Sequence, residues 1–185
     1  ETEHWIPNAA FPGNPPAGST TTVAGGLART VAAAPQTYFT GVQPARILDT
    51  RDGTGLSGAF GPGQTRDLTV LNVGGVPADA TSVVLNVTAT GQSAESCVMV
   101  WPGGQTRPLA SNLNPRPGGG DTPAMVTTRV GPGGTVQLYN NSGSTHLVAD
   151  VVGWYDQPGS GSGSLYVPLA PTRVLDSRDG TGGKT

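Results

Sequence analysis

The chain has 185 residues, of which 29 are glycine and 17 are proline, and its formal net charge at pH 7 is -2. Apolar residues make up 35% of the sequence and charged residues only 12%, which argues against disorder, because disordered chains combine low hydrophobicity with high charge. The single lysine (Lys184) argues against a nucleic-acid-binding surface, the single cysteine (Cys97) excludes an intrachain disulfide, and no stretch reaches the ~20 apolar residues of a membrane span.

A twelve-residue motif occurs twice in the chain. Residues 44–55 read PARILDTRDGTG and residues 171–182 read PTRVLDSRDGTG, so nine of the twelve positions are identical, at a constant offset of 127. Similarity within one chain at a fixed offset is the signature of a repeat protein. We therefore expect one complete repeat unit and the start of a second.

The repeat divides the chain into four segments. Residues 1–37 are rich in Pro, Gly, Ala and Thr and are expected to be a leader or linker. The complete unit should cover 38–157, a flexible Gly/Ser linker 158–164, and the start of the second unit 165–185. The complete unit has the length of an ordinary domain.

Within the unit, short apolar runs with many β-branched residues alternate with Gly- and Pro-rich turns, a pattern typical of short strands. The runs at 82–89 and 146–152 are apolar on both faces, so both strands should be covered on both sides. The pattern predicts an all-β fold, either a β-sandwich or a closed barrel, of about eight short strands. The expected strands are 45–49, 67–73, 81–89, 97–101, 109–114, 124–130, 135–139 and 145–155.

A weaker echo lies inside the unit. Residues 48–51 (LDTR) resemble 113–116 (LNPR), and residues 84–87 (VLNV) resemble 148–151 (VADV), at offsets of 65 and 64. If this echo reflects duplication, the unit consists of two pseudo-symmetric half-units. The alternative is coincidence in a glycine-rich sequence, and the residues alone leave both interpretations open.

Charged residues within apolar runs predict ion pairs. Asp150 stands alone on an apolar strand face, and a buried carboxylate is seldom left unpaired. We expect Arg51 to be its partner. The echo then predicts the symmetric pair of Arg116 with Asn86, and we expect both pairs to be structural.

The repeated motif also has the outline of a calcium-binding loop, with Asp49 and Asp52 on either side of Arg51. An arginine at the third loop position repels a cation, and the twelfth position carries Phe60 in place of glutamate. We therefore favour a turn that Asp49 caps, with calcium as the alternative. No cofactor is expected.

Catalytic groups find little support. His146 and Asp150 share a strand face but are separated by ~13 Å of extended chain, which is too far for a dyad. Cys97 alternates with Met99 and Trp101 and is expected to pack as a small hydrophobe. The alternative for Cys97 is an intermolecular disulfide, because a lone cysteine in a secreted protein sometimes links two chains. The sequence therefore predicts no enzyme.

Three aromatic residues lie at strand ends. Trp101 precedes a Pro-Gly-Gly turn, and Trp154 and Tyr155 close the last predicted strand. Aromatic faces can stack on sugar rings, so these side chains are candidates for ligand binding. Packing in the core or against a neighbouring domain is the favoured alternative, because large aromatics dominate burial.

The order of several short motifs resembles a repeat found in secreted and surface proteins of actinobacteria. The resemblance covers 43–157 and restarts at 166. It implies tandem, extracellular, β-rich modules and supplies no catalytic residues. The motifs are PxRxLDTR at 44–51, GVP at 75–77, VVLNVTA at 83–89, SNLN at 111–114 and DVVGWY at 150–155.

Two functions follow as expectations. The first is a non-catalytic structural or adhesive module of an extracellular repeat protein, which joins neighbouring copies head to tail by exchanging a strand. Its partners would be copies of the same chain or adjacent repeat units. The second is a module that binds carbohydrate or cell-wall polysaccharide and is attached to a secreted enzyme.

Overall fold

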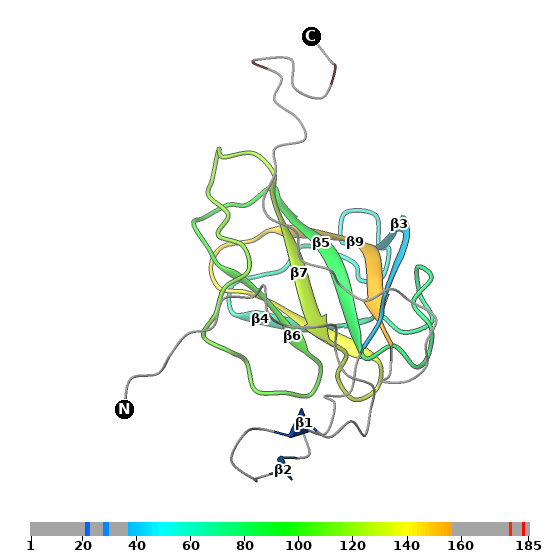
Figure 1. Cartoon of the computed structure of the whole chain (residues 1–185). Helices are drawn as coiled ribbons and strands as arrows, with labels where there is room; N and C mark the ends of the chain where they lie inside the picture. Colours follow the sequence, from blue (N-terminus) through cyan, green and yellow to red (C-terminus); the bar gives the residue numbers. More distant parts are fainter. Residues whose placement is uncertain (1–20, 23–27, 30–36, 157–177, 179–182, 184–185) are drawn as a thin grey trace.

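The structure of the chain is a computed structural model (Figure 1). It describes residues 21–22, 28–29, 37–156, 178 and 183. The predicted linker over 158–164, and nearly all of the predicted leader and second unit, lie outside the described residues. No helix that could cross a membrane is found among the described residues.

Seven strands of the unit form two antiparallel sheets, which confirms the predicted all-β sandwich (Figure 1). One sheet has four strands in the order β3-β9-β5-β7, and the other has three in the order β4-β8-β6. The alternative of a closed barrel is wrong, because the two sheets stay separate. The strands are β3 (Phe39–Asp49), β4 (Gln64–Thr69), β5 (Ser82–Thr90), β6 (Val98–Pro102), β7 (Thr122–Arg129), β8 (Thr135–Asn140) and β9 (His146–Tyr155); β1 (Thr21–Thr22) and β2 (Ala28–Arg29) form a separate pair.

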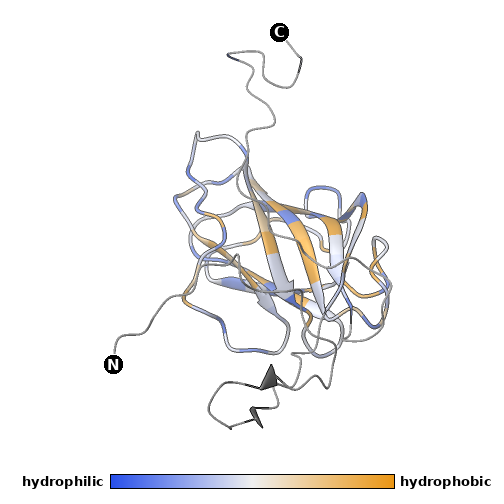
Figure 2. Ribbon diagram, in the orientation of Figure 1, coloured by the Kyte–Doolittle hydropathy of each residue, from blue (hydrophilic) through white to orange (hydrophobic). Residues whose placement is uncertain are grey.

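The core lies between the two sheets, and its centre is built on β5 and β9 (Figure 2). The inward side chains of these strands are almost completely buried, because each strand has a hydrogen-bonded neighbour on both sides and the second sheet across from it. On the opposite face, Val84 and Val148 are also buried, as the two-sided apolar pattern predicts. The inward residues of the two strands are Val83, Leu85, Val87, Ala89, Leu147, Ala149 and Val151.

The strand predicted over 109–114 is wrong. This segment belongs to the long connection between β6 and β7, and Leu113 alone forms an isolated bridge, with Val98 of β6. Pro108 and Pro115 lack the N–H that a strand ladder needs. Leu113 is nevertheless buried, so the apolar signal marked a core residue and not a strand.

The predicted half-units also fail. The echoed residues 84–87 and 148–151 do lie on adjacent antiparallel strands, with Asn86 directly opposite Asp150. However, Leu48 pairs with β9 in the four-stranded sheet, whereas the echoed Leu113 is bridged to β6 in the other sheet. The echo therefore does not extend to two equivalent halves.

A shift of register in β3 determines which face of the sheet the charged residues of the repeated motif occupy. Arg46 lies opposite Asp150 of β9, and Leu48 lies opposite the next residue, Ala149, so Ile47 has no partner in the ladder. An extra residue of this kind reverses the alternation of faces beyond it. Asp49 consequently lies on the same outer face of the sheet as Arg46, although the two are three residues apart.

Candidate functional site

The first copy of the repeated motif forms the second half of β3 and the turn that follows it. Its centre is Asp49, which is 2% exposed although it lies on the outer face of the sheet. Oδ1 of Asp49 accepts hydrogen bonds from the backbone N–H (3.1 Å) and Nε (2.8 Å) of Arg51. Oδ2 accepts from Nη2 of Arg51 at 2.6 Å and from Nη1 of Arg46 at 3.2 Å. Two guanidinium groups therefore cover this carboxylate.

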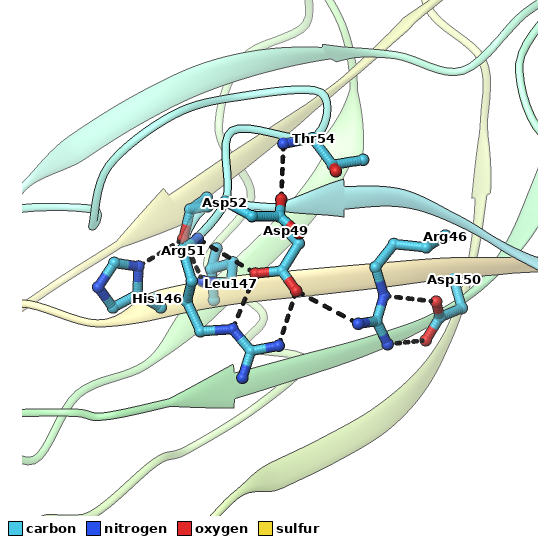
Figure 3. A network of polar contacts seen from close by, with 9 residues as sticks. Arg46, Asp49, Arg51, Asp52, Thr54, His146, Leu147 and Asp150 are labelled. Atoms are coloured by element: carbon cyan, nitrogen blue, oxygen red, sulfur yellow. Dashed lines mark hydrogen bonds and ion pairs between the residues drawn. The ribbon is translucent and has the colours of Figure 1, made fainter.

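Arg46 extends the network to the neighbouring strand (Figure 3). Its Nε donates to Oδ1 of Asp150 at 3.0 Å, and its Nη2 lies 3.4 Å from Oδ2 of the same carboxylate. This fork-to-carboxylate geometry is the one that arginine provides and lysine does not. The guanidinium of Arg46 thus bridges Asp49 at the end of β3 and Asp150 on β9.

The hydrogen bonds from Arg51 hold the pKa of Asp49 well below its usual value. Burial of the carboxylate opposes this shift, and the charges of Arg51 and Arg46 reinforce it. Asp49 is therefore ionised at neutral pH. Its charge makes the motif a fixed ion-pair cluster.

Thr50 connects the motif to the start of β9. Its Oγ1 accepts the backbone N–H of Leu147 at 3.0 Å and lies 2.9 Å from Nδ1 of His146. The backbone N–H of Thr50 in turn donates to the carbonyl of Leu147 at 3.1 Å. Thr50 is only 1% exposed, and its hydroxyl and its backbone N–H are both hydrogen-bonded. The corresponding residue of the second copy, Ser177, also carries a hydroxyl.

The remaining residues of the motif form the turn after β3. Oδ1 of Asp52 accepts the backbone N–H of Thr54 at 2.9 Å, which is an Asx turn. At Gly55 φ is +70°, and a Cβ there would lie 2.3 Å from the carbonyl oxygen of Ile47. Only glycine fits this close approach. The contacts within the edge strand and its turn therefore account for the residue types of the first copy of the motif.

The predicted ion pairs need correction. Asp150 pairs with Arg46 and not with Arg51, because Arg51 turns back onto Asp49. Asp150 is also less buried than expected, with 23% of its side chain exposed. The predicted pair of Arg116 with Asn86 is not formed: Arg116 lies 3.9 Å from the carboxylate of Glu95, and both side chains are about three-quarters exposed.

The two calcium candidates do not converge on one point. Both oxygens of Asp49 face guanidinium groups, and Asp52 holds the N–H of Thr54. Among the described residues, no group of three His, Cys, Asp or Glu side chains is arranged to hold a metal ion. The motif has the outline of a calcium loop and the contacts of an ion-pair cluster.

The aromatic candidates are mostly buried. Trp101 is 5% exposed, with its Nε1 donating to the carbonyl of Gln105 at 3.0 Å, and Trp154 is 9% exposed within the core. Tyr155 is half-buried, and its ring packs on Phe39 with 5.3 Å between centroids. Neither tryptophan presents a free face to a sugar, so their role is packing.

Cys97 is a free thiol, half-buried and immediately before β6. Its burial fits the prediction that it packs as a small hydrophobe. The intermolecular disulfide stays a prediction.

Sequence reasoning missed the role of Arg46, whose guanidinium joins the carboxylates of Asp49 and Asp150. Arg46 and Asp49 would lie on opposite faces of a regular strand, because side chains alternate with a period of two. Arg46 does belong to the repeated motif, as Arg173 in the second copy, and this recurrence was the available signal.

Comparison with known proteins adds no functional information: no family model matches the chain, and no curated protein is significantly similar to it.

Proposed function

We propose that residues 38–157 form a non-catalytic structural module of an extracellular repeat protein, and that neighbouring copies join head to tail. The observation that carries this proposal is the use of the repeated motif. In the first copy, these residues form part of an edge strand, an ion-pair cluster around the buried Asp49 and a tight turn, so the sequence that the chain repeats is one that makes structural contacts in this copy. The sequence resemblance supports an extracellular location.

The position of β3 supports joining by strand exchange. β3 is the outer strand of its sheet, and β9 is its one partner strand among the described residues. Residues 172–176 (TRVLD) repeat the pattern of 45–49 (ARILD), including the arginine, the leucine and the aspartate that contact β9 or the core. The second copy carries the residues needed to occupy the β3 position of a neighbouring molecule. Such a contact is heterologous and generates filaments when it does not close.

The test is light scattering with negative-stain electron microscopy on residues 1–185. We expect ordered filaments or defined oligomers. Leu175→Asp should abolish them, because Leu175 corresponds to the fully buried Leu48. Ser162→Asp in the Gly/Ser segment is the matched control and should leave assembly intact. Monomers in every sample, or assembly that survives Leu175→Asp, would overturn the proposal.

A further inference from the structure

β3 fills one edge of the four-stranded sheet, beside β9 (Figure 1). The pairing is antiparallel, with Phe39 opposite Tyr155 and Asp49 opposite Val148, so β3 begins beside the end of β9. We call the edge of β9 from Val148 to Tyr155 the β3 position. Antiparallel neighbours need only a hairpin connection. A strand that follows β9 in the chain therefore has the direction needed to occupy this position by turning back along β9.

Residues 166–176 follow β9 and repeat the spacing of β3. Five kinds of residue recur at the offset of 127: an aromatic residue, a proline, an arginine, a leucine and an aspartate. With Tyr166 opposite Tyr155, ten residues remain to connect the two strands, and they include the Gly/Ser segment 158–164. Neighbouring strands lie about 4.8 Å apart, a distance that a flexible connection of this length spans easily. The five pairs are Phe39/Tyr166, Pro44/Pro171, Arg46/Arg173, Leu48/Leu175 and Asp49/Asp176.

The proline that the second copy adds is compatible with the β3 position. Pro168 stands where β3 has Gly41. The N–H of Asp156 donates to the carbonyl oxygen of Tyr38 at 3.2 Å, and hydrogen-bonded and non-bonded pairs alternate along an antiparallel ladder. The N–H of Gly41, three residues further on, consequently faces away from β9. An edge strand tolerates proline where its N–H would face outwards.

Two other differences between the strands act in opposite directions. Ile47 is 2% exposed, and the smaller Val174 would fill this place in the core less completely, which favours β3. Oγ1 of Thr40 is buried without a hydrogen-bond partner among the described residues, and Val167 has nearly the same shape without the hydroxyl, which favours residues 166–176. Each difference changes the binding of a strand by about tenfold. The two strands are therefore closely matched.

We propose that residues 39–49 and 166–176 of the same chain compete for the β3 position, so that either the strand before the module or the strand after it completes the sheet. The inference rests on the proposed fit of the second copy to this position, and it adds a choice between the chain's own module and a neighbour. A short flexible connection gives an effective concentration of about 1 mM. At about 10 µM protein, exchange within the chain is thus favoured about a hundredfold over exchange between chains.

The test is disulfide trapping in the full chain at about 10 µM. Exchange would place Arg173 opposite Asp150, where Arg46 lies in the structure. In a Cys97→Ser background, we expect Asp150→Cys and Arg173→Cys to form a disulfide within one chain, which a non-reducing gel and peptide mass spectrometry identify. Ser162→Cys in place of Arg173→Cys is the matched control. It lies nearer in sequence but outside the exchanged strand, and it should react at least tenfold more slowly.

A second variant tests exchange without added cysteines. Leu48 is fully buried, so Leu48→Asp should unfold a module that depends on β3 alone. We expect the Leu48→Asp chain to stay folded and monomeric by circular dichroism and light scattering, and Leu48→Asp with Leu175→Asp to unfold. Unfolding of Leu48→Asp alone would overturn the inference.

The trapping result also separates the inference from the proposed function. Disulfides only between chains would support the joining of neighbouring copies and overturn exchange within a chain. No disulfide with Arg173→Cys, or one that forms as fast with Ser162→Cys, would overturn the inference as well, and filaments in the assembly test would still support the proposed function.

Discussion

Residues 48–51 and 113–116 have similar sequences, but their polar side chains make different contacts. In the first segment the leucine is buried against β9, and the following aspartate is covered by Arg46 and Arg51. In the second segment the leucine is also buried, but the following asparagine and the arginine are exposed. The apolar position of the pattern thus predicts burial in both places. The polar positions become a cluster only where a neighbouring strand and a second arginine complete it.

The backbone explains part of this difference. Oδ1 of Asp49 is held by the backbone N–H of the residue two positions on, in addition to its side chain. The carboxylate is then charged and fully hydrogen-bonded, so its burial costs little. At the second site the neutral Asn114 is followed by Pro115, and Arg116 is left with a contact of 3.9 Å to Glu95.

The largest expected effect comes from removing the charge at the first site. Asp49→Asn gives this position the amide found at Asn114, and it should lower the free energy of unfolding by about 2–3 kcal/mol, because a buried charge that two guanidinium groups share is lost. Urea denaturation measures the change. Asp52→Asn, three residues away, is the matched control and should be nearly neutral, since asparagine also forms Asx turns. A loss below about 0.5 kcal/mol for Asp49→Asn would show that the two segments are equivalent.

The same difference should depend on pH. The pKa of Asp49 is lower in the folded protein than the value of 3.8 that applies to the unfolded chain. Its stabilising effect is therefore complete above about pH 5 and decreases as the pH falls below about 4, where the unfolded chain takes up the proton first. At pH 3 the gap between the wild type and Asp49→Asn should be smaller by about 1 kcal/mol than at pH 7. Urea denaturation at the two pH values measures both gaps, and a constant gap would contradict the assigned charge.

Asp150 should contribute less than Asp49. Its side chain is 23% exposed and that of Arg46 is 46% exposed, so water and salt screen the pair. We expect Asp150→Asn to cost about 0.5–1 kcal/mol, and the cost should decrease in high salt. A double-mutant cycle with Arg46→Gln isolates the pair. A coupling energy above about 2 kcal/mol would mean that the pair behaves as a fully buried one.

The smallest effect is expected at the echoed arginine. Arg116→Ala should change the free energy of unfolding by less than about 0.5 kcal/mol, because its ion pair with Glu95 is long and exposed. Differential scanning calorimetry beside Arg51→Ala tests the contrast directly, since the Arg51 variant should melt at a clearly lower temperature. Equal melting temperatures for the two variants would show that Arg51 and Arg116 contribute equally to stability, which contradicts the difference between the two segments.

The sequence by itself determined the fold class and most of the strands. Runs such as 82–89 and 146–152 are apolar on both faces and bounded by turn residues, and local pattern is enough to identify such strands. It also determined that the repeated motif matters, because nine identical positions mark a shared constraint. It failed at 109–114, where an apolar residue inside a proline-containing connection imitates a strand.

Only the tertiary structure decided which charges meet. The unpaired Ile47 places Arg46 and Asp49 on one face, and the antiparallel register of β3 on β9 then brings Asp150 opposite Arg46. Strand order and register depend on contacts between residues about a hundred positions apart, which periodicity along the chain does not encode. Local spacing fixes which residues are apolar or charged, and the packing of distant strands fixes their partners.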